Sequence, residues 1–236
     1  MNRYFENMPI ADFFKIIAKD NGVHEPEAQV MVADCSKWIE EMMTNNNLSP
    51  DEYFDLIGSG SYKEVYDLPY GNGFVIKFVI QQNHTRRELQ IMELAEQEGL
   101  DGIFMPTYTY LLPNKITSTI ISEEEGLPIS FNYIMIQPRI AFTNGESGEF
   151  IDFKSPTFWL DNGYKVYTAD LKRLDLPGLA WLLSVRKHYG DDYTQTFLEF
   201  CYCREITDLH SGNIGWYETP NGALVPTIID WISIID

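Results

Sequence analysis

Three side chains that could do chemistry fall close together in the stretch EITDLHSGNIGW, residues 205–216. They are Asp208, His210 and Asn213. A carboxylate at a loop turn can accept a proton from a hydroxyl nucleophile, and the amide oxygen of an asparagine is a hard ligand suited to Mg²⁺. Asp230 follows an apolar run and could supply a second oxygen ligand. Taken alone, each of these residues could equally cap a turn.

A second group of such residues lies nearer the N-terminus. Gly58, Ser59 and Gly60 form a turn whose backbone N–H groups could approach an anion closely, although a Gly-Ser-Gly hairpin is usually structural. Lys77 sits in an apolar run, where an inward-pointing ammonium group is costly to desolvate unless it meets an anion. The alternative is an edge-strand lysine that faces water. Glu88 follows eleven residues later and is an ordinary solvated glutamate unless it partners Lys77.

The spacing of apolar residues predicts the elements that position these groups. Helices are expected over residues 9–20, 25–43, 84–98, 169–189 and 191–204. Strands are expected in three antiparallel pieces over 54–80, and over 116–121, 131–136 and 224–229. The segment 137–167 mixes Pro, Gly, Asn and aromatic residues, and we expect a long connection there. Lys77 is therefore predicted on a strand, Glu88 on a helix and Asp208 just after a helix.

Composition excludes several classes of function. The 236 residues are 44% hydrophobic and 22% charged, as in ordinary folded proteins, and no window approaches the ~18 apolar residues of a membrane span. The N-terminus lacks the pattern of a signal peptide, so a cytoplasmic protein is expected. The net charge of −18 argues against direct binding to nucleic acid, which requires an excess of Lys and Arg. That charge leaves two alternatives: a solvated acidic surface, or an acidic face that docks on a basic partner.

The order of these groups along the chain is more specific than any one of them. A Gly-x-Gly turn, a strand lysine, a helical glutamate, an Asp-x-x-x-x-Asn loop and an apolar strand ending in Asp follow one another. Together they are the parts that phosphoryl transfer from a nucleotide requires. On these motifs the sequence resembles the protein-kinase superfamily.

The resemblance can be followed motif by motif over most of the chain. Residues 58–65 resemble the glycine-rich loop G-x-G-x-x-G-x-V, and Val75-Ile76-Lys77 is similar to the V-A-I-K strand. Residues 131–139 resemble the strand that enters the hinge between two lobes. Residues 206–213 resemble the loop H-R-D-L-x-x-x-N, and Ile229-Asp230-Trp231 stands where D-F-G would be.

The resemblance implies roles for these residues, with ATP and Mg²⁺ as cofactors. The nucleotide would be bound by Gly58, Ser59, Gly60, Val65, Lys77, Gln137, Asn213 and Asp230. Glu88 would hold Lys77 in place. Asp208 would orient the attacking hydroxyl and take its proton. Asn213 and Asp230 would hold the metal ion.

Several positions depart from the protein-kinase pattern. Lys63 replaces the third glycine of the glycine-rich loop, and His210 stands where a lysine near the γ-phosphate is usual. The run Asp-Leu-His-Ser-Gly-Asn is similar to that of aminoglycoside and other small-molecule phosphotransferases. Six residues follow Asp230 in the sequence, which leaves no room for an activation segment. We therefore expect no regulation by phosphorylation of such a segment.

Within the superfamily the chain looks most like the early serine/threonine protein kinases of short-tailed lytic bacteriophages. This resemblance implies an α+β, two-lobed kinase-like fold. It would have a helical N-terminal extension over 1–50, an N-lobe over 51–137 with a five-stranded antiparallel sheet, and a minimal, mostly helical C-lobe over 138–236. It also implies ATP-dependent phosphorylation of host proteins, the transcription machinery among them, in the bacterial cytoplasm.

Two other functions stay open at this point. A small-molecule phosphotransferase would explain the Asp-Leu-His-Ser-Gly-Asn run and the missing activation segment. A binding module would keep the kinase-like fold and bind a host protein through its acidic surface, with catalysis secondary or lost. Loss of catalysis is disfavoured by the retained catalytic and metal-binding positions, Lys77, Glu88, Asp208, Asn213 and Asp230.

Overall fold

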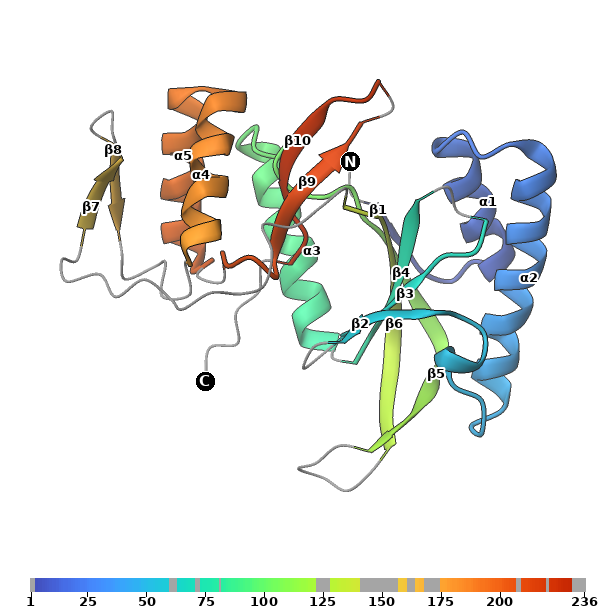
Figure 1. Ribbon diagram of the computed structural model, residues 1–236. Helices are drawn as coiled ribbons and strands as arrows, with labels where there is room; N and C mark the ends of the chain where they lie inside the picture. The colour runs from blue at the N-terminus through green and yellow to red at the C-terminus, as the bar shows by residue number, and fades with distance from the viewer. Residues whose placement is uncertain are drawn as a thin grey trace. The chain divides into compact units, whose positions relative to one another are not determined.

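The computed structural model describes residues 3–59, 63–70, 73–80, 82–121, 128–140, 157–160, 164–167, 175–206, 209–219 and 221–230. It contains two compact units, whose elements are labelled in Figure 1. The first unit is Met1–Arg86 with Pro106–Arg139, and the second is Arg87–Met105 with Ile140–Asp236. Both contain helices and strands, so the expected α+β class is confirmed. The predicted boundaries at residues 50 and 137 stay predictions.

The first unit is built on a mixed sheet of six strands in the order β1-β5-β6-β4-β3-β2. The strands are β1 (Arg3–Phe5), β2 (Leu56–Ser59), β3 (Lys63–Asp67), β4 (Phe74–Val79), β5 (Tyr108–Ile121) and β6 (Pro128–Pro138). Strands β2 to β6 pair antiparallel, but β1 lies parallel to β5 at the edge of the sheet. The prediction of a five-stranded, purely antiparallel sheet is therefore wrong. A run of three residues is too short for strand alternation to reveal it in the sequence.

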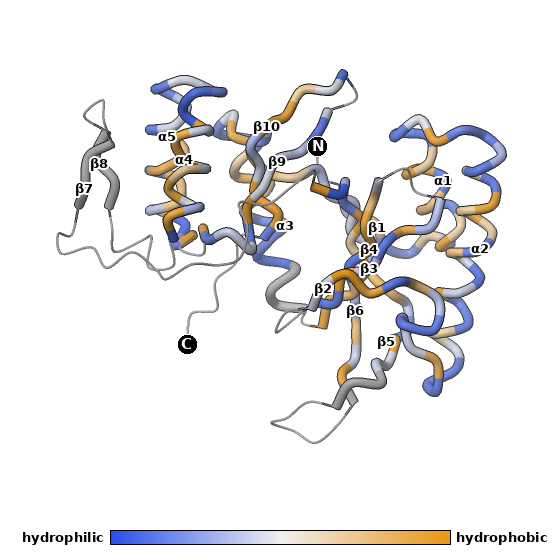
Figure 2. Tube along the Cα trace, viewed as in Figure 1, coloured by the Kyte–Doolittle hydropathy of each residue, from blue (hydrophilic) through white to orange (hydrophobic). Residues whose placement is uncertain are grey.

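Two helices cover one face of this sheet. They are α1 (Ile10–Asp20) and α2 (Glu25–Thr44), which lie beside each other (Figure 1). Apolar residues at helical spacing, such as Phe13 and Ile17, are buried and share one hydrophobic core with Phe78 of β4. Hydrophilic and hydrophobic residues follow one another repeatedly along α2 (Figure 2), as expected of a helix with one side on a core.

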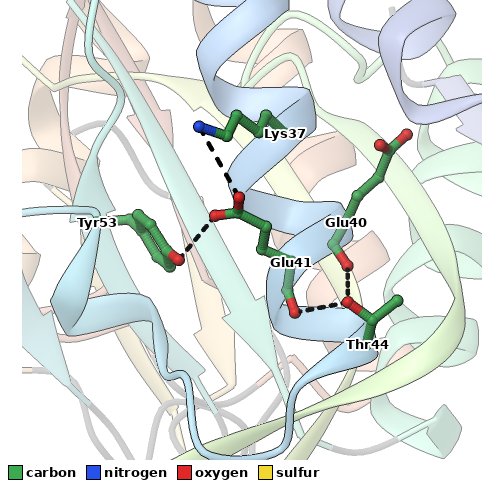
Figure 3. Close-up of polar contacts among 5 residues, drawn as sticks. All are labelled: Lys37, Glu40, Glu41, Thr44 and Tyr53. Atoms are coloured by element: carbon green, nitrogen blue, oxygen red, sulfur yellow. Dashed lines mark hydrogen bonds and ion pairs between the residues drawn. The ribbon is translucent and has the colours of Figure 1, made fainter.

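The C-terminal half of α2 is also bonded to the segment that leads into β2. The Tyr53 hydroxyl donates to the Glu41 carboxylate at 2.9 Å, and the other oxygen of that carboxylate lies 3.8 Å from the Lys37 ammonium (Figure 3). The Trp38 ring stacks on Tyr53 with centroids 5.7 Å apart and meets Phe54 edge-on. The helices therefore share a core with the sheet, and α2 is also hydrogen-bonded to the segment before β2.

The second unit holds most of α3 (Gln82–Gln97), together with α4 (Leu176–Tyr189) and α5 (Asp191–Arg204). It also contains two antiparallel hairpins, β7 (Thr157–Leu160) with β8 (Tyr164–Tyr167) and β9 (Ile214–Glu218) with β10 (Leu224–Ile228). Trp181 of α4 packs edge-on against Phe197 of α5. These rings share one core with Ile91 of α3 and Ile214 of β9. The second unit therefore packs three helices and a hairpin around one core.

The segment after α3 is tied to β10. Ile228 N donates to Ile103 O at 2.8 Å, and Met105 N donates to Ile228 O at 3.1 Å. The Thr227 hydroxyl adds a bond to Ile103 O at 3.0 Å. The strand that precedes Asp230 is thereby fixed to residues 103–105, which follow α3.

The helix predictions over 9–20, 25–43, 84–98 and 191–204 are confirmed to within two residues at each end. The predicted helix over 169–189 is represented by α4, and the residues before Asp175 lie outside the described chain. Strand β5 is longer than the predicted strand, and β9 was not predicted. No helix in the described part of the chain combines the length and the apolar character needed to cross a membrane.

Candidate functional site

Lys77 lies on a central strand, because β4 pairs with β3 on one side and with β6 on the other. The residue is 6% exposed, so the alternative of an edge-strand lysine facing water is wrong. In the register it stands opposite Val65 and Met135. Its neighbours Ile76 and Phe78 pack in the core that α1 and α2 complete. Because side chains alternate along a strand, Lys77 lies on the opposite face of the sheet.

Two more of the predicted nucleotide-binding residues share that face. Gly58 pairs with Val65, and Val65 pairs with Lys77, so the three form one row across β2, β3 and β4. A Cβ atom added at Gly58 would meet no atom of the described residues within 4 Å, so the space on their side of its backbone is open. Ser59 pairs with Glu64 and not with this row. Gly60 lies outside the described residues.

Lys63 joins Lys77 on the same face of the sheet. It is two residues from Val65 on β3, and it is 9% exposed. Burying an ammonium group is favourable only beside groups that replace its hydration, anions above all. Lys63 stands where the protein-kinase pattern has its third glycine. It therefore places a second cation beside the row of Gly58, Val65 and Lys77.

Gln137 lies two residues after Met135 on β6, which places it on the Lys77 face as well. It is 2% exposed, and its side-chain nitrogen donates to Thr107 Oγ1 at 2.7 Å. Thr109, opposite Met135 on β5, was missed by the sequence analysis. Its hydroxyl is buried and has no hydrogen-bond partner among the described residues. Since an unmet buried hydroxyl costs about 1–3 kcal/mol, it is a place where a ligand could bond.

Glu88 lies on α3 as predicted and is 1% exposed, which excludes a solvated glutamate. Its neighbour Arg87 donates to Arg204 O at 3.5 Å and lies 3.5 Å from the Glu205 carboxylate. Helix α3 is thereby attached to the end of α5, the helix that leads into the candidate loop. The pairing of Glu88 with Lys77 stays a prediction, because the two residues belong to different units.

The candidate loop is the turn at residues 209–213, which buried apolar residues anchor on either side. Asn213 N donates to His210 O at 2.9 Å, and Gly212 N donates to the ring Nδ1 of His210 at 3.0 Å. A side chain at Gly212 would displace the ring, because its Cβ would stand 2.9 Å from Cε1. The glycine therefore lets the histidine ring fold over its own turn.

The ring of His210 also reaches the amide of Asn213, with Nε2 and Nδ2 3.3 Å apart. Because Gly212 donates to Nδ1, the neutral ring carries its proton on Nε2. That proton requires an oxygen acceptor, which Asn213 offers when its amide is turned so that Oδ1 faces the ring. His210 can therefore orient the amide of Asn213, a predicted metal ligand. Its predicted place near the γ-phosphate stays a prediction.

The hairpin of β9 and β10 brings Asn213 and Asp230 together. Ile214 stands opposite Ile228 in the register, so the residues just outside the hairpin meet. The carbonyl oxygen of Asn213 accepts hydrogen bonds from Ile229 N at 2.9 Å and from Asp230 N at 3.3 Å. The predicted metal-binding pair is thus adjacent through its backbone. Asp208, the predicted proton acceptor, lies outside the described residues.

The donor chemistry of this pair fits the predicted metal. Asparagine and aspartate oxygens are hard ligands, and Mg²⁺ is commonly held by one or two protein oxygens while waters and substrate phosphates complete its shell. No three His, Cys, Asp or Glu side chains gather into a metal site within the described ranges. Asn213 and Asp230 are a pair of described residues whose oxygens could hold Mg²⁺.

Asp175 supports the candidate loop and was missed by the sequence analysis. It caps α4 and also accepts a hydrogen bond from Ser211 N, 36 residues away. The run Asp175-Leu176-Pro177 carries the usual signal of a helix start, a capping residue followed by proline in the first turn. That signal could have placed the start of α4 correctly. Nothing in the sequence connects it with Ser211, because the contact depends on tertiary packing.

Comparisons of the chain with protein-family models, with curated proteins and with solved structures gave no match. The likeness to protein kinases therefore rests on the residues described above.

Proposed function

We propose that this chain is an ATP- and Mg²⁺-dependent phosphotransferase that modifies serine or threonine hydroxyls of host proteins. The observation that carries the proposal is the bond from Asp230 N to Asn213 O, which joins the two predicted metal ligands at the open end of one hairpin. Two hard oxygen side chains, one in a loop and one at a strand end, are what phosphoryl transfer requires of its metal site.

The row of Gly58, Val65 and Lys77 supports the nucleotide half of the proposal. An open backbone beside a buried ammonium group suits a polyphosphate, since N–H groups and a cation can both face it. Lys63 adds positive charge on the same face, in a chain whose net charge is −18. A local concentration of buried lysines is unusual in such an acidic protein and favours an anionic ligand.

The proposed reaction follows from these roles. The acceptor hydroxyl oxygen bonds to the γ-phosphorus while the bond from that phosphorus to the β–γ bridging oxygen breaks, and the hydroxyl proton passes to Asp208. ADP leaves with the bridging oxygen. Lys77 would orient the α- and β-phosphates. Mg²⁺ bound by Asn213 and Asp230 would neutralise charge on the phosphate oxygens.

Transfer of labelled γ-phosphate from ATP into a bacterial lysate tests the proposal. We expect label in discrete protein bands with the wild-type chain and a loss of about 100- to 10,000-fold with Asp208→Asn, the range a positioned proton acceptor contributes. Glu218→Gln, which removes an exposed carboxylate of the same unit, serves as the control and should label normally.

The same assay separates the other functions. ATP consumption with label only in small molecules would point to a small-molecule acceptor and contradict the protein-kinase half of the proposal. No consumption of ATP by the wild-type chain in any lysate fraction would contradict the proposal as a whole. In that case a binding module would be the remaining explanation of the acidic surface.

A further inference from the structure

Asp175 is a fully buried carboxylate that joins α4 to the candidate loop. It is 0% exposed and is the N-cap of α4. Its Oδ1 accepts a hydrogen bond from Gly178 N at 2.7 Å, and its Oδ2 accepts one from Ser211 N at 3.1 Å. Each carboxylate oxygen therefore has a backbone donor, one in the helix and one in the loop.

These two hydrogen bonds fix the distance between the first turn of α4 and the backbone of Ser211. A buried carboxylate is costly unless it is bonded, and hydrogen bonds to a charged oxygen are stronger than those between neutral groups. Helix α4 supports the chain a second time through Trp181, whose Nε1 donates to Gly215 O at 3.1 Å. The backbone is thus tied to α4 at Ser211 and at Gly215, on either side of Asn213.

We propose that Asp175 is a positioning residue of the candidate site, which holds Ser211, and through it Asn213, where metal and nucleotide require them. The proposal rests on the proposed phosphotransferase function. Both oxygens of Asp175 are taken by backbone donors, so the carboxylate acts through the loop and not on the substrate.

Two substitutions separate this role from helix capping. Asp175→Ser keeps a cap of similar quality, but its single oxygen cannot serve Gly178 and Ser211 together. Asp175→Asn keeps the cap through its amide oxygen and turns an N–H group toward Ser211 N–H. Asp175→Ala removes both bonds and shows what loss of the cap adds.

The first readout is amide hydrogen exchange, which requires neither a substrate nor activity. We expect the Ser211 amide to exchange at least about 10-fold faster in Asp175→Ser and Asp175→Asn, while amides in the middle of α4 keep their wild-type rates. In Asp175→Ala the first turn of α4 should exchange faster as well. Unchanged exchange at Ser211 in all three variants would overturn the proposal.

The second readout is the kinetics of phosphate transfer. We expect kcat to fall about 100-fold in Asp175→Ser and Asp175→Asn, because a small displacement of a catalytic group is enough for such a loss. The KM for ATP should change less than kcat does, because Gly58 and Lys77 are untouched and only the contact through Asn213 is displaced. Wild-type kcat in a variant whose Ser211 amide exchanges fast would overturn the positioning role.

The experiments distinguish a wrong proposed function from a wrong role for Asp175. A wild-type chain that transfers no phosphate contradicts the proposed function. The exchange rates at Ser211 then decide alone whether Asp175 holds the loop.

Discussion

At the scale of single residues, Lys77 is the side chain whose surroundings restrict its role most. It is buried on a central strand, on the sheet face that α1 and α2 do not cover. Alternation of strand side chains predicted an inward lysine but could not decide between a central and an edge strand. Only the pairing of β4 with both β3 and β6 excludes the edge.

We expect Lys77→Met to lose the stabilisation that Mg-ATP gives the wild-type chain. A ligand that binds only the folded state at about 100 times its dissociation constant adds about 2.7 kcal/mol. In a chain of this size that raises Tm by roughly 5–10 °C. Methionine keeps the apolar stem of the lysine but removes the charge that would face the phosphates. The measurement is Tm with and without Mg-ATP.

The control for this experiment is Lys115→Met, which removes an exposed lysine from β5. It should show the full wild-type rise in Tm with Mg-ATP. A full rise in Lys77→Met as well would mean that Lys77 does not contact the nucleotide.

At the scale of elements, the length and period of the apolar pattern decided what could be predicted. Helices α1, α2 and α5 and strands β4 and β6 carry long, regular patterns, and they were predicted. Strand β1 is three residues long, and β9 begins directly after a polar glycine-containing loop, so neither stood out. The candidate residues could be assigned to a strand, a helix and a loop. The contact of Asp175 with Ser211 and the orphan hydroxyl of Thr109 depend on tertiary packing, which no local pattern encodes.

Helix α5 ends just before the candidate loop at a residue with unfavourable backbone geometry. Glu205 adopts the left-handed conformation with φ of 55°, where a Cβ atom costs about 1–2 kcal/mol. We expect Glu205→Gly to be more stable than Glu205→Ala by about 1 kcal/mol, because glycine removes that cost. Both variants lose the carboxylate that lies near Arg87, so the ion pair cancels in the comparison.

The measurement for this element is the free energy of unfolding of the two variants by denaturant titration. Equal stabilities would show that the end of α5 rearranges in solution to relieve the strain. Glu205→Val should be less stable than both, since a branched side chain tolerates this conformation worst.

At the scale of the whole molecule, buried acidic groups limit stability at high pH. Burial raises the pKa of the Cys35 thiol from 9.0 to about 12, and burial also raises the pKa values of Tyr66, Tyr189 and Tyr193. The unfolded chain releases these protons at lower pH than the folded chain does. Their contribution to stability is therefore complete below pH 9 and is lost as pH rises toward 12.

We expect Tm to change little up to about pH 9 and to fall steeply above it. Each lost proton also adds negative charge to a chain whose net charge is already −18, which increases its self-repulsion. Cys35→Val removes one of the buried titrating groups and should make the fall less steep. If Tm falls equally steeply with pH in the wild-type protein and in Cys35→Val, titration of Cys35 does not contribute to the loss of stability.

The measurement that tests the central claim most directly is the Mg²⁺ dependence of phosphate transfer in Asn213→Ala and Asp230→Asn. The claim is that the hairpin of β9 and β10 joins these two residues into the metal site of a phosphotransferase. We predict that both variants require at least about 10-fold more Mg²⁺ for half of their maximal rate, while Glu218→Gln requires the wild-type amount. Transfer with unchanged Mg²⁺ dependence in both variants would contradict the account.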